Sequence, residues 1–367
     1  MKILHVINHM NMGGAQSLLA ELVPEQIAMG HEVSVLELEK STDLTLTHRL
    51  ASHGVRVESL SSGRSCRNPL NVFSLLPYFK VNDVVHVHLF PANYWIALSK
   101  ILSFSNVPIV TTEHSTDNRR RHIAVFKYID AFIYGRYESV IACSDKALDT
   151  FKKRFPKVKC ESIPNGIGLK HYKSAVPYCK MELAGVPEDS FVFTMVARFQ
   201  YPKRQDILVR ALAEMPETCH CVLVGGAQDD EGVLKVKKLS EELRVNDRVH
   251  FLYTRADVPA ILKSSDAVVL SSEYEGLSLS SIEGLASGKP VVASDVQGLR
   301  EVIGGVGELF GFEDHLALSR ILTRMSEDKD YSKEIADRCS ARAEEYDIAS
   351  TAKMYDEVYN RISCRRY

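Results

Sequence analysis

The sequence predicts an α/β protein of two domains, each built on a parallel sheet with helices on both faces. Short apolar segments rich in β-branched residues alternate with segments of helical spacing along the chain, which is the pattern of such sheets. The alternation stops once near the middle and then begins again, so the chain contains two sets of strands. A length of 367 residues exceeds one ordinary core and suits two domains of usual size.

The first set of strands is expected in the N-terminal half, where segments of helical spacing such as Leu18, Leu19 and Leu22 separate the strands. The second set follows the same alternation in the C-terminal half. Each half is therefore expected to be Rossmann-like, with a cleft between the two. The expected strands are residues 2–8, 33–37, 84–88, 109–113 and 139–142 in the first set, and 191–197, 221–225, 249–252, 267–270 and 290–293 in the second.

The boundary between the domains is expected in the loop-rich segment SIPNGIGLKHYKSAVPYCK, which holds an Asn-Gly pair and two prolines. We assign residues 1–172 to the first domain and residues 173–346 to the second. The last segment, residues 347–367, has helical spacing and fits neither sheet by its pattern. We therefore expect it to pack across one or both domains.

Composition and charge exclude several classes of function. The 45 basic and 47 acidic residues give a net charge of -2, so no overall positive field favours nucleic acid. The start, MKILHVINHMNMGG, has too short an apolar run for a signal peptide, and residues 123–135 are too short and too interrupted to span a bilayer. Eight scattered cysteines without a C-x-x-C pair fit reduced thiols, and the cluster Cys219-His220-Cys221 is typical of a buried strand. We expect a cytoplasmic protein.

Candidate ligand-binding residues follow the strands, because open α/β sheets bind ligands beyond the carboxyl ends of their strands. Gly13 and Gly14 open the first helix, where a bare backbone can approach an anion, although a plain β–α turn has the same sequence. His86 and His88 share one face of a strand but lack a third partner for a metal ion. His114 follows the strand 109–113 and is placed either to hydrogen-bond a ligand or to serve a structural role.

Two cations follow the first strand of the second domain. Arg198 ends this strand, and Lys203 precedes a helix expected at residues 205–212. Because a helix N-terminus carries partial positive charge, this arrangement suits a phosphate group. The alternative is a pair of solvated surface cations.

The segment EYEGLSLSSIEGLASGKPVV places two acids around a helix start. Ser280 and Glu283 match a capping box, and Gly288 is expected to end the helix. A diphosphate could accept hydrogen bonds from the amides that lead into the helix. Glu283 would reach two vicinal hydroxyls of a ribose, while Glu275 stays in the loop and would contact a second sugar. The amides in question belong to Leu277, Ser278 and Leu279.

In this order, these elements resemble the retaining glycosyltransferases of family 4, which have the two-domain GT-B fold. The resemblance covers nearly the whole chain. Three positions depart from the family pattern: Ala197 and Ser278 replace a usual Gly and a frequent Gly or Pro, and Gly168 stands where Asp often follows IPNGI. The resemblance is carried by EGLSLSSIE from Glu275 to Glu283, by ARFQYPK with Arg198 and Lys203, and by the GGAQ, TTEHST and IPNGI segments.

The resemblance implies a role for each matching position. Glu283 would bind the ribose, Glu275 the transferred sugar, and Arg198 with Lys203 the diphosphate. The helix at residues 347–367 would cross back to the first domain. The implied catalytic residues are His114, Glu275, Arg198 and Lys203, and the implied substrate-binding residues are Gly13, Gly14, Arg198, Lys203, Tyr253, Arg255, Glu275, Leu277, Ser278, Leu279 and Glu283.

The implied reaction is transfer of a hexosyl-type sugar from a nucleoside diphosphate donor, with UDP-sugars favoured over GDP-sugars. The acceptor would be a saccharide or a lipid-linked saccharide of surface polysaccharide biosynthesis. No cofactor and no metal are expected, because side-chain cations and a helix N-terminus can stabilise the leaving group and no D-x-D motif lies near a strand end. Two alternatives are a nucleotide-sugar epimerase of the same fold and a non-catalytic sugar-nucleotide binding protein.

A basic cluster indicates how the acceptor could be reached. Arg119, Arg120 and Arg121 precede the amphipathic segment 123–134. Such a segment can rest on an anionic membrane surface, here the inner face of the cell membrane, where lipid-linked saccharides are found. A solvated run of charges is the alternative interpretation.

Overall fold

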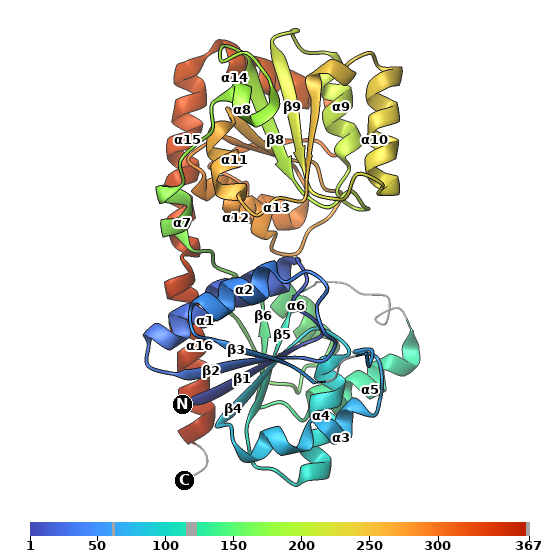
Figure 1. Cartoon of the computed structure of the whole chain (residues 1–367), viewed down its shortest axis with the longest axis vertical. Coiled ribbons are helices and arrows are strands. Elements are labelled where there is room, and N and C mark those ends of the chain that lie inside the picture. Colours follow the sequence, from blue (N-terminus) through green and yellow to red (C-terminus); the bar gives the residue numbers. More distant parts are fainter. Residues whose placement is uncertain (61–62, 115–122, 365–367) are drawn as a thin grey trace. The chain divides into compact units, whose positions relative to one another are not determined.

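The computed structural model describes residues 1–60, 63–114 and 123–364 of the chain. The chain divides into two compact units, one formed by Met1–Ile167 with Ile348–Tyr367 and the other by Gly168–Asp347. Each unit is a parallel sheet with helices on its faces (Figure 1). The predicted α/β fold is therefore confirmed.

The first unit holds a seven-stranded parallel sheet in the order β3-β2-β1-β4-β5-β6-β7. The sequence prediction missed β3 (Arg56–Ser59) and β7 (Cys160–Ser162), because these edge strands are partly exposed and lack an apolar run. The remaining strands lie close to the predicted positions: β1 (Lys2–Ile7), β2 (Glu32–Glu37), β4 (Val84–His88), β5 (Ile109–Glu113) and β6 (Ser139–Ala142).

Alternate side chains of β1 and β4 face opposite layers of this unit. Leu4, Val85 and Val87 belong to an apolar core shared with residues of α4. The histidines between them are bonded to side chains of α1 and α16, so they lie on the opposite face. Figure 1 shows α1 and α16 on one side of the sheet and α4 on the other. The helices of this unit are α1 (Gly14–Ala28), α2 (Thr45–Ser52), α3 (Asn71–Ser74), α4 (Ala92–Ser103), α5 (Ala124–Tyr134), α6 (Asp145–Arg154) and α16 (Ile348–Ser363).

The second unit holds a six-stranded parallel sheet in the order β10-β9-β8-β11-β12-β13. The sequence prediction missed its short edge strand β13 (Glu308–Phe310). The other strands are β8 (Phe191–Val196), β9 (Cys219–Val224), β10 (Val249–Tyr253), β11 (Ala267–Leu270) and β12 (Val291–Ser294). The helices are α7 (Leu169–Ser174), α8 (Lys180–Ala184), α9 (Gln205–Ala213), α10 (Glu231–Glu242), α11 (Val258–Ser264), α12 (Leu279–Ala286), α13 (Gln297–Ile303), α14 (His315–Glu327) and α15 (Lys329–Ala343).

Each sheet has one point where the direction of winding reverses. In the first unit the chain runs from β1 outward to β3 and then returns to β4, which pairs with β1 on its other side. In the second unit it runs from β8 to β10 and returns to β11 beside β8. Ligands of open α/β sheets bind at such reversals, beyond the carboxyl ends of the strands. The loops after β1, β4, β8 and β11 are therefore the places to look for a site.

The C-terminal helix α16 belongs to the first unit. Its Tyr355 and Tyr359 are fully buried, which accounts for aromatic residues at this spacing. The amide of Ile348 donates to the carbonyl of Ile167 at 2.9 Å. A side chain at Gly166 would lie 2.8 Å from the Cα of Ile348, so the glycine of the IPNGI segment allows the helix to approach the chain closely.

Candidate active site

The loop after β8 carries the two predicted cations of the second unit. Arg198 is exposed, and its guanidinium lies 3.1 and 3.2 Å from the side-chain oxygen of Gln200 when that amide is turned toward it. The carbonyl of Arg198 accepts a hydrogen bond from Gln205 at the start of α9, at 2.9 Å. The loop backbone is thus fixed to the helix, while the charge of Arg198 faces a neutral group.

Two glycines pack closely against the backbone of this loop. A side chain at Gly232 in α10 would lie 2.8 Å from the carbonyl carbon of Phe199, and one at Gly225 would lie 2.9 Å from that of Ala197. Gly225 also has a φ of +127°, which L residues rarely adopt. The sequence analysis missed both positions. The pair Gly225-Gly226, at the end of the predicted strand 221–225, was the available signal for Gly225.

The loops after β8 and β11 are bonded to each other. The hydroxyl of Ser271 lies 3.0 Å from the carbonyl oxygen of Lys203 and 2.7 Å from that of Arg204. The amide of Glu273 donates to the carbonyl of Pro202 at 2.9 Å. The reversal point of the second sheet is therefore a connected pair of loops.

Lys203 and Glu275, both predicted site residues, form an ion pair across these two loops. The hydroxyl of Ser272 donates to the same carboxylate oxygen of Glu275 at 2.7 Å. The side chains of Lys203 and Glu275 are only 17% and 12% exposed, so the pair is partly desolvated. An ammonium group has three donors, which allows Lys203 to hold Glu275 and an anion together.

The N-terminus of α12 differs from the sequence prediction. The helix begins at Leu279, one residue before the predicted N-cap Ser280, and Ser278 occupies the N-cap without a side-chain cap hydrogen bond. The predicted capping box of Ser280 with Glu283 is therefore wrong. The hydroxyl of Ser281 donates to the carbonyl of Ser278 at 2.6 Å, which tightens the first turn. The first amides of α12 thus have no side-chain cap, and they remain suited to an anion.

A third glycine supports the Glu275 loop. A side chain at Gly298 in α13 would lie 2.7 Å from the carbonyl carbon of Glu275 and closer still to the carbonyl oxygens of Glu275 and Gly276. The loop before α12 therefore rests directly on the backbone of α13. Glu283 lies one turn inside α12 and is partly exposed.

Tyr253 and Arg255 lie further along the same sheet edge, after β10. Three strand spacings of about 4.8 Å separate β10 from β11, or about 14 Å. The hydroxyl of Tyr253 accepts from Lys237 at 3.0 Å. The guanidinium of Arg255 is bonded to Asp257 at 2.8 and 2.6 Å, and it lowers the pKa of Asp257 to about 2. These two residues are thus not in the Lys203–Glu275 cluster.

In the first unit, α1 starts at Gly14, with Gly13 in extended backbone conformation at its N-cap. A side chain at Gly13 would lie 2.6 Å from the amide oxygen of Gln16, which is the end of a flexible side chain and can move aside. A Cβ at Gly14 would have no heavy atom of the described residues within 4 Å. The space in front of Gly14 is open, as expected where a ligand approaches the backbone.

His5 of β1 joins the predicted pair His86 and His88 of β4. All three are fully buried, and their ligand atoms lie within 4.8 Å of one another, which would suit a metal ion in composition. Each ring nitrogen is, however, already hydrogen-bonded to a neighbouring side chain. The sequence analysis missed His5, because its partners are distant in the chain and only strand pairing brings them together.

His114 follows β5 and is partly exposed, with its Nε2 lying 3.2 Å from Nδ1 of His88. Burial lowers the pKa of His5 and of His114 to about 4, and lowers that of His86 and His88 well below the usual value. All four imidazoles are therefore neutral near pH 7. The clusters around His114 and Lys203 belong to different units, and each is described by itself.

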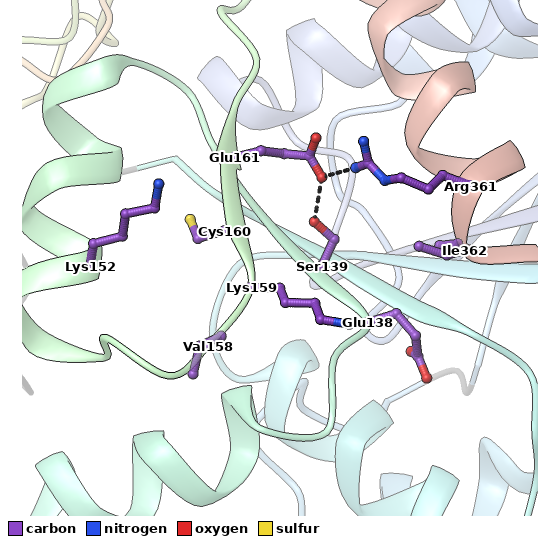
Figure 2. A pocket seen from close by; sticks show the side chains of 9 residues that line it. All are labelled: Glu138, Ser139, Lys152, Val158, Lys159, Cys160, Glu161, Arg361 and Ile362. Atoms are coloured by element: carbon purple, nitrogen blue, oxygen red, sulfur yellow. Dashed lines mark hydrogen bonds and ion pairs between the residues drawn. The ribbon is translucent and has the colours of Figure 1, made fainter. Parts of the chain in front are cut away.

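One pocket of the first unit contains no predicted site residue. It has a volume of about 330 Å³ and is lined by residues of β6, β7, α6 and α16 (Figure 2). The carboxylate of Glu161 accepts from Ser139 at 2.7 Å and pairs with Arg361, and Glu138 pairs with Lys100 at 2.6 Å. Its acids are thus engaged with neighbouring side chains. The lining residues are Glu138, Ser139, Lys152, Val158, Lys159, Cys160, Glu161, Arg361 and Ile362.

Comparisons with known proteins show to which family this chain belongs. Residues 12–171 match the model described as Glycosyltransferase Family 4, and residues 181–346 match the model described as Glycosyl transferases group 1. The chain belongs to this glycosyltransferase family. The predicted family is thus confirmed, and the fold of the glycosyltransferase is of the GT-B type.

This glycosyltransferase is similar to two proteins named as glycosyltransferases and to one solved structure. It is 28% identical over 311 residues to a D-inositol 3-phosphate glycosyltransferase of Xylanimonas cellulosilytica, covering 77% of this chain and 73% of that protein. It is 26% identical over 292 residues to the UDP-Gal:alpha-D-GlcNAc-diphosphoundecaprenol alpha-1,3-galactosyltransferase of Escherichia coli, covering 74% and 73%. The crystal structure of Alr3699/HepE of Anabaena in complex with UDP and glucose matches with a TM-score of 0.85 and 22% identity, over 98% of this chain and 100% of that chain.

Proposed function

We propose that this glycosyltransferase transfers a hexosyl-type sugar from a UDP-sugar to a saccharide or lipid-linked saccharide, with retention of the anomeric configuration and without a metal ion or cofactor. A GDP-sugar is the second choice of donor. The observation that carries the proposal is the partly buried Lys203–Glu275 pair, which lies at the reversal point of the second sheet beside an uncapped helix N-terminus.

The diphosphate would be bound by charges that this structure leaves available. Arg198 has no carboxylate within ion-pair distance among the described residues, and its charge can therefore serve a ligand. Lys203 can bridge between Glu275 and a phosphate oxygen. The amides of Leu279 and Ser280 add the partial positive charge of the α12 N-terminus. Together these groups would stabilise the negative charge of the departing nucleoside diphosphate.

The transferred sugar would lie against Glu275. One oxygen of this carboxylate already accepts hydrogen bonds from Lys203 and Ser272, so its electron pairs are engaged. This favours a role in holding sugar hydroxyls over attack on the anomeric carbon. The bond between the anomeric carbon and the phosphate oxygen would break with its electron pair going to the phosphate. The acceptor hydroxyl would attack from the same face and pass its proton to that phosphate oxygen.

Calorimetric titration of UDP tests the site. Arg198→Ala removes a charged hydrogen-bond donor, and we expect the Kd for UDP to rise about 10- to 100-fold. Glu283→Ala is expected to weaken UDP as well, because the ribose loses an acceptor. Arg210→Ala, which removes an exposed arginine of α9, serves as the matched control and is expected to leave the Kd unchanged. Unchanged UDP affinity in both Arg198→Ala and Glu283→Ala would refute the assignment.

Product analysis tests the reaction. NMR of the product is expected to show the same anomeric configuration as the donor. Isolation of a covalent glycosyl-enzyme would contradict same-face attack by the acceptor. Exchange of the C2 proton of the donor sugar with solvent, in the absence of any acceptor, would indicate an epimerase instead.

The acceptor side of the proposal concerns α5. Its Val125, Tyr128, Ile129 and Phe132 recur at helical spacing and are all exposed, Tyr128 by 76%. Among the described residues, no helix combines the length and the apolar composition that crossing a bilayer requires. An exposed apolar stripe next to a basic run suits contact with an anionic bilayer surface. The run itself, Arg119, Arg120 and Arg121, lies outside the described residues.

Flotation with anionic liposomes tests this contact. Replacing Tyr128 and Phe132 by Ser is expected to abolish binding, and replacing the three arginines by Gln is expected to weaken it strongly. Leu234→Ser, which changes an exposed leucine of α10 in the other unit, is the control and is expected to bind as the wild type does. Equal flotation of all variants would refute contact through α5. Contact at the inner face of the cell membrane would support a lipid-linked acceptor.

A further inference from the structure

A continuous chain of hydrogen-bonded side chains runs from α1 to His114. Nε2 of His5 lies 2.8 Å from the amide oxygen of Gln26, and Nδ1 of His5 lies 3.0 Å from Nε2 of His88. Nδ1 of His88 then lies 3.2 Å from Nε2 of His114. Gln26, His5 and His88 are fully buried, so water does not interrupt the chain. His114 is its only partly exposed member.

The direction of the chain is set at Gln26. The amide nitrogen of Gln26 lies 3.4 Å from the hydroxyl of Tyr359 in α16, and this hydroxyl lies 2.6 Å from Nδ1 of His86. The nitrogen donates to Tyr359, whose hydroxyl can give its own proton to Nδ1 of His86. The amide oxygen of Gln26 is thereby turned toward His5. Because this oxygen can only accept, Nε2 of His5 must carry a proton.

Each following ring then has one possible tautomer. A neutral imidazole has one proton, so Nδ1 of His5 is an acceptor and Nε2 of His88 must donate to it. Nδ1 of His88 is consequently an acceptor, and Nε2 of His114 must donate to it. Burial lowers the pKa of each of these rings, which keeps them neutral near pH 7 and supports the count of one proton each.

We propose that Gln26, His5 and His88 are positioning residues that fix His114 as the Nε2–H tautomer, so that its Nδ1 accepts a hydrogen bond from a hydroxyl of the transferred sugar. This inference rests on the proposed function for the identity of the ligand. A neutral acceptor has a chemical advantage here, because positive charge develops on the sugar as its bond to phosphate breaks. A protonated imidazole would repel that charge.

The same histidines are the group that could hold a metal ion, and the two roles exclude each other. A metal ion would need free lone pairs on His5, His86 and His88 directed at one point. In the hydrogen-bonded chain from Gln26 to His114, Nε2 of His88 carries a proton and points at His5 instead. Stoichiometric zinc, copper or nickel retained by the purified chain in metal analysis would therefore overturn the proposal.

The direct test is NMR of the full chain labelled with ¹⁵N-histidine, in which two-bond ¹⁵N–¹H correlations report the tautomer of each ring. The His114 signals are assigned by their loss in His114→Gln. We expect a protonated Nε2 and an unprotonated Nδ1 for His5, His88 and His114 at pH 7. A protonated Nδ1 on His114 would overturn the proposal. This readout needs no turnover, so it is independent of whether the proposed function holds.

Variants of Gln26 test the coupling. Gln26→Met removes the acceptor that sets the direction, and we expect both tautomers of His114 to appear. For transfer from a UDP-sugar we expect kcat to fall about fivefold with little change in the KM for the donor, since one hydrogen bond is weakened and the diphosphate contacts remain.

Leu22→Met changes another buried residue of α1, leaves the hydrogen bonds of Gln26, His5 and His88 in place, and is the control for packing. It is expected to retain the wild-type tautomer and kcat. An unmixed Nε2–H tautomer of His114 in Gln26→Met would refute the role of Gln26. A wild type that shows the expected tautomers but transfers no sugar would instead refute the proposed function and leave the tautomer chain in place.

Discussion

Gly298→Ala is the sharpest perturbation of the second unit, because it adds one methyl group behind Glu275. The new Cβ would lie 2.7 Å from the carbonyl carbon of Glu275. Carbon atoms in contact are separated by about 3.5 Å or more, so the loop or α13 must move by about 1 Å. The carbonyl oxygens of Glu275 and Gly276 lie closer still, and both belong to backbone that a rotamer change cannot displace.

The expected cost is divided between stability and activity. Overpacking of this size costs about 1 to 3 kcal/mol of unfolding free energy, and Ala in place of a helical Gly returns about 1 kcal/mol. The net loss of stability is therefore about 1 kcal/mol. A misplacement of about 1 Å at a reacting group costs roughly 100-fold in rate. We expect kcat/KM for sugar transfer from a UDP-sugar to fall by about that factor.

The assay combines urea unfolding with initial rates at fixed UDP-sugar. Gly311→Ala is the matched control, because its Cβ would meet only the Cβ of Asp314 at an ordinary 3.7 Å. It is expected to retain both stability and activity. Gly298→Ala with wild-type kcat/KM would refute the view that α13 positions Glu275. If Gly298→Ala yields no folded protein, Glu275→Gln, which leaves the backbone unchanged, is expected to show the loss of activity instead.

Three further predictions follow from named contacts. Gly14→Ala is expected to keep or raise the unfolding free energy, since its Cβ meets no described atom within 4 Å, but to lower sugar transfer, and unchanged transfer would contradict a ligand at this helix start. Ser272→Ala removes one donor to Glu275 and is expected to lower kcat/KM about fivefold, whereas Ser326→Ala, which removes a hydroxyl bonded within α14, is expected to have no effect. Acid is expected to destabilise the first unit, because burial lowers the folded-state pKa of His5 from 6.5 to about 4. As the pH falls from 6.5 towards 4, the unfolded chain therefore binds more protons than the folded chain. At pH 5 the protonation of His5 alone lowers the free energy of unfolding by about 2 kcal/mol. Urea unfolding followed by the fluorescence of Trp95, the single tryptophan of the chain and a residue of this unit, measures the effect, and an unchanged midpoint between pH 7 and pH 5 would contradict it.

The central strands of both sheets were predictable because buried parallel strands are continuous apolar runs. Edge strands such as β3 and β13 lack that signal, since water covers part of their surface. The N-cap of α12 was placed two residues late because S-x-x-E at Ser280 satisfies the capping pattern, whereas the N-cap of the helix is Ser278. Local pattern cannot show this, because the loop before the helix is positioned by α13.

The candidate site was predictable in its residue types more than in its contacts. Lys203 and Glu275 were expected to bind different parts of a ligand, and in the structure they are paired with each other. Their contact joins loops that are 72 residues apart, and no sequence window contains both. The same holds for His5 and His88, which are 83 residues apart and meet only because their strands are neighbours in the sheet.

The central claim is that Arg198, Lys203 and the N-terminus of α12 together bind a pyrophosphate. A crystal structure of the chain with UDP tests it most directly. The account predicts that the pyrophosphate oxygens lie within hydrogen-bond distance of the Arg198 guanidinium, the Lys203 ammonium and an amide of the first turn of α12. A UDP bound with its phosphates away from all three groups, and Lys203 still paired with Glu275 alone, would contradict it.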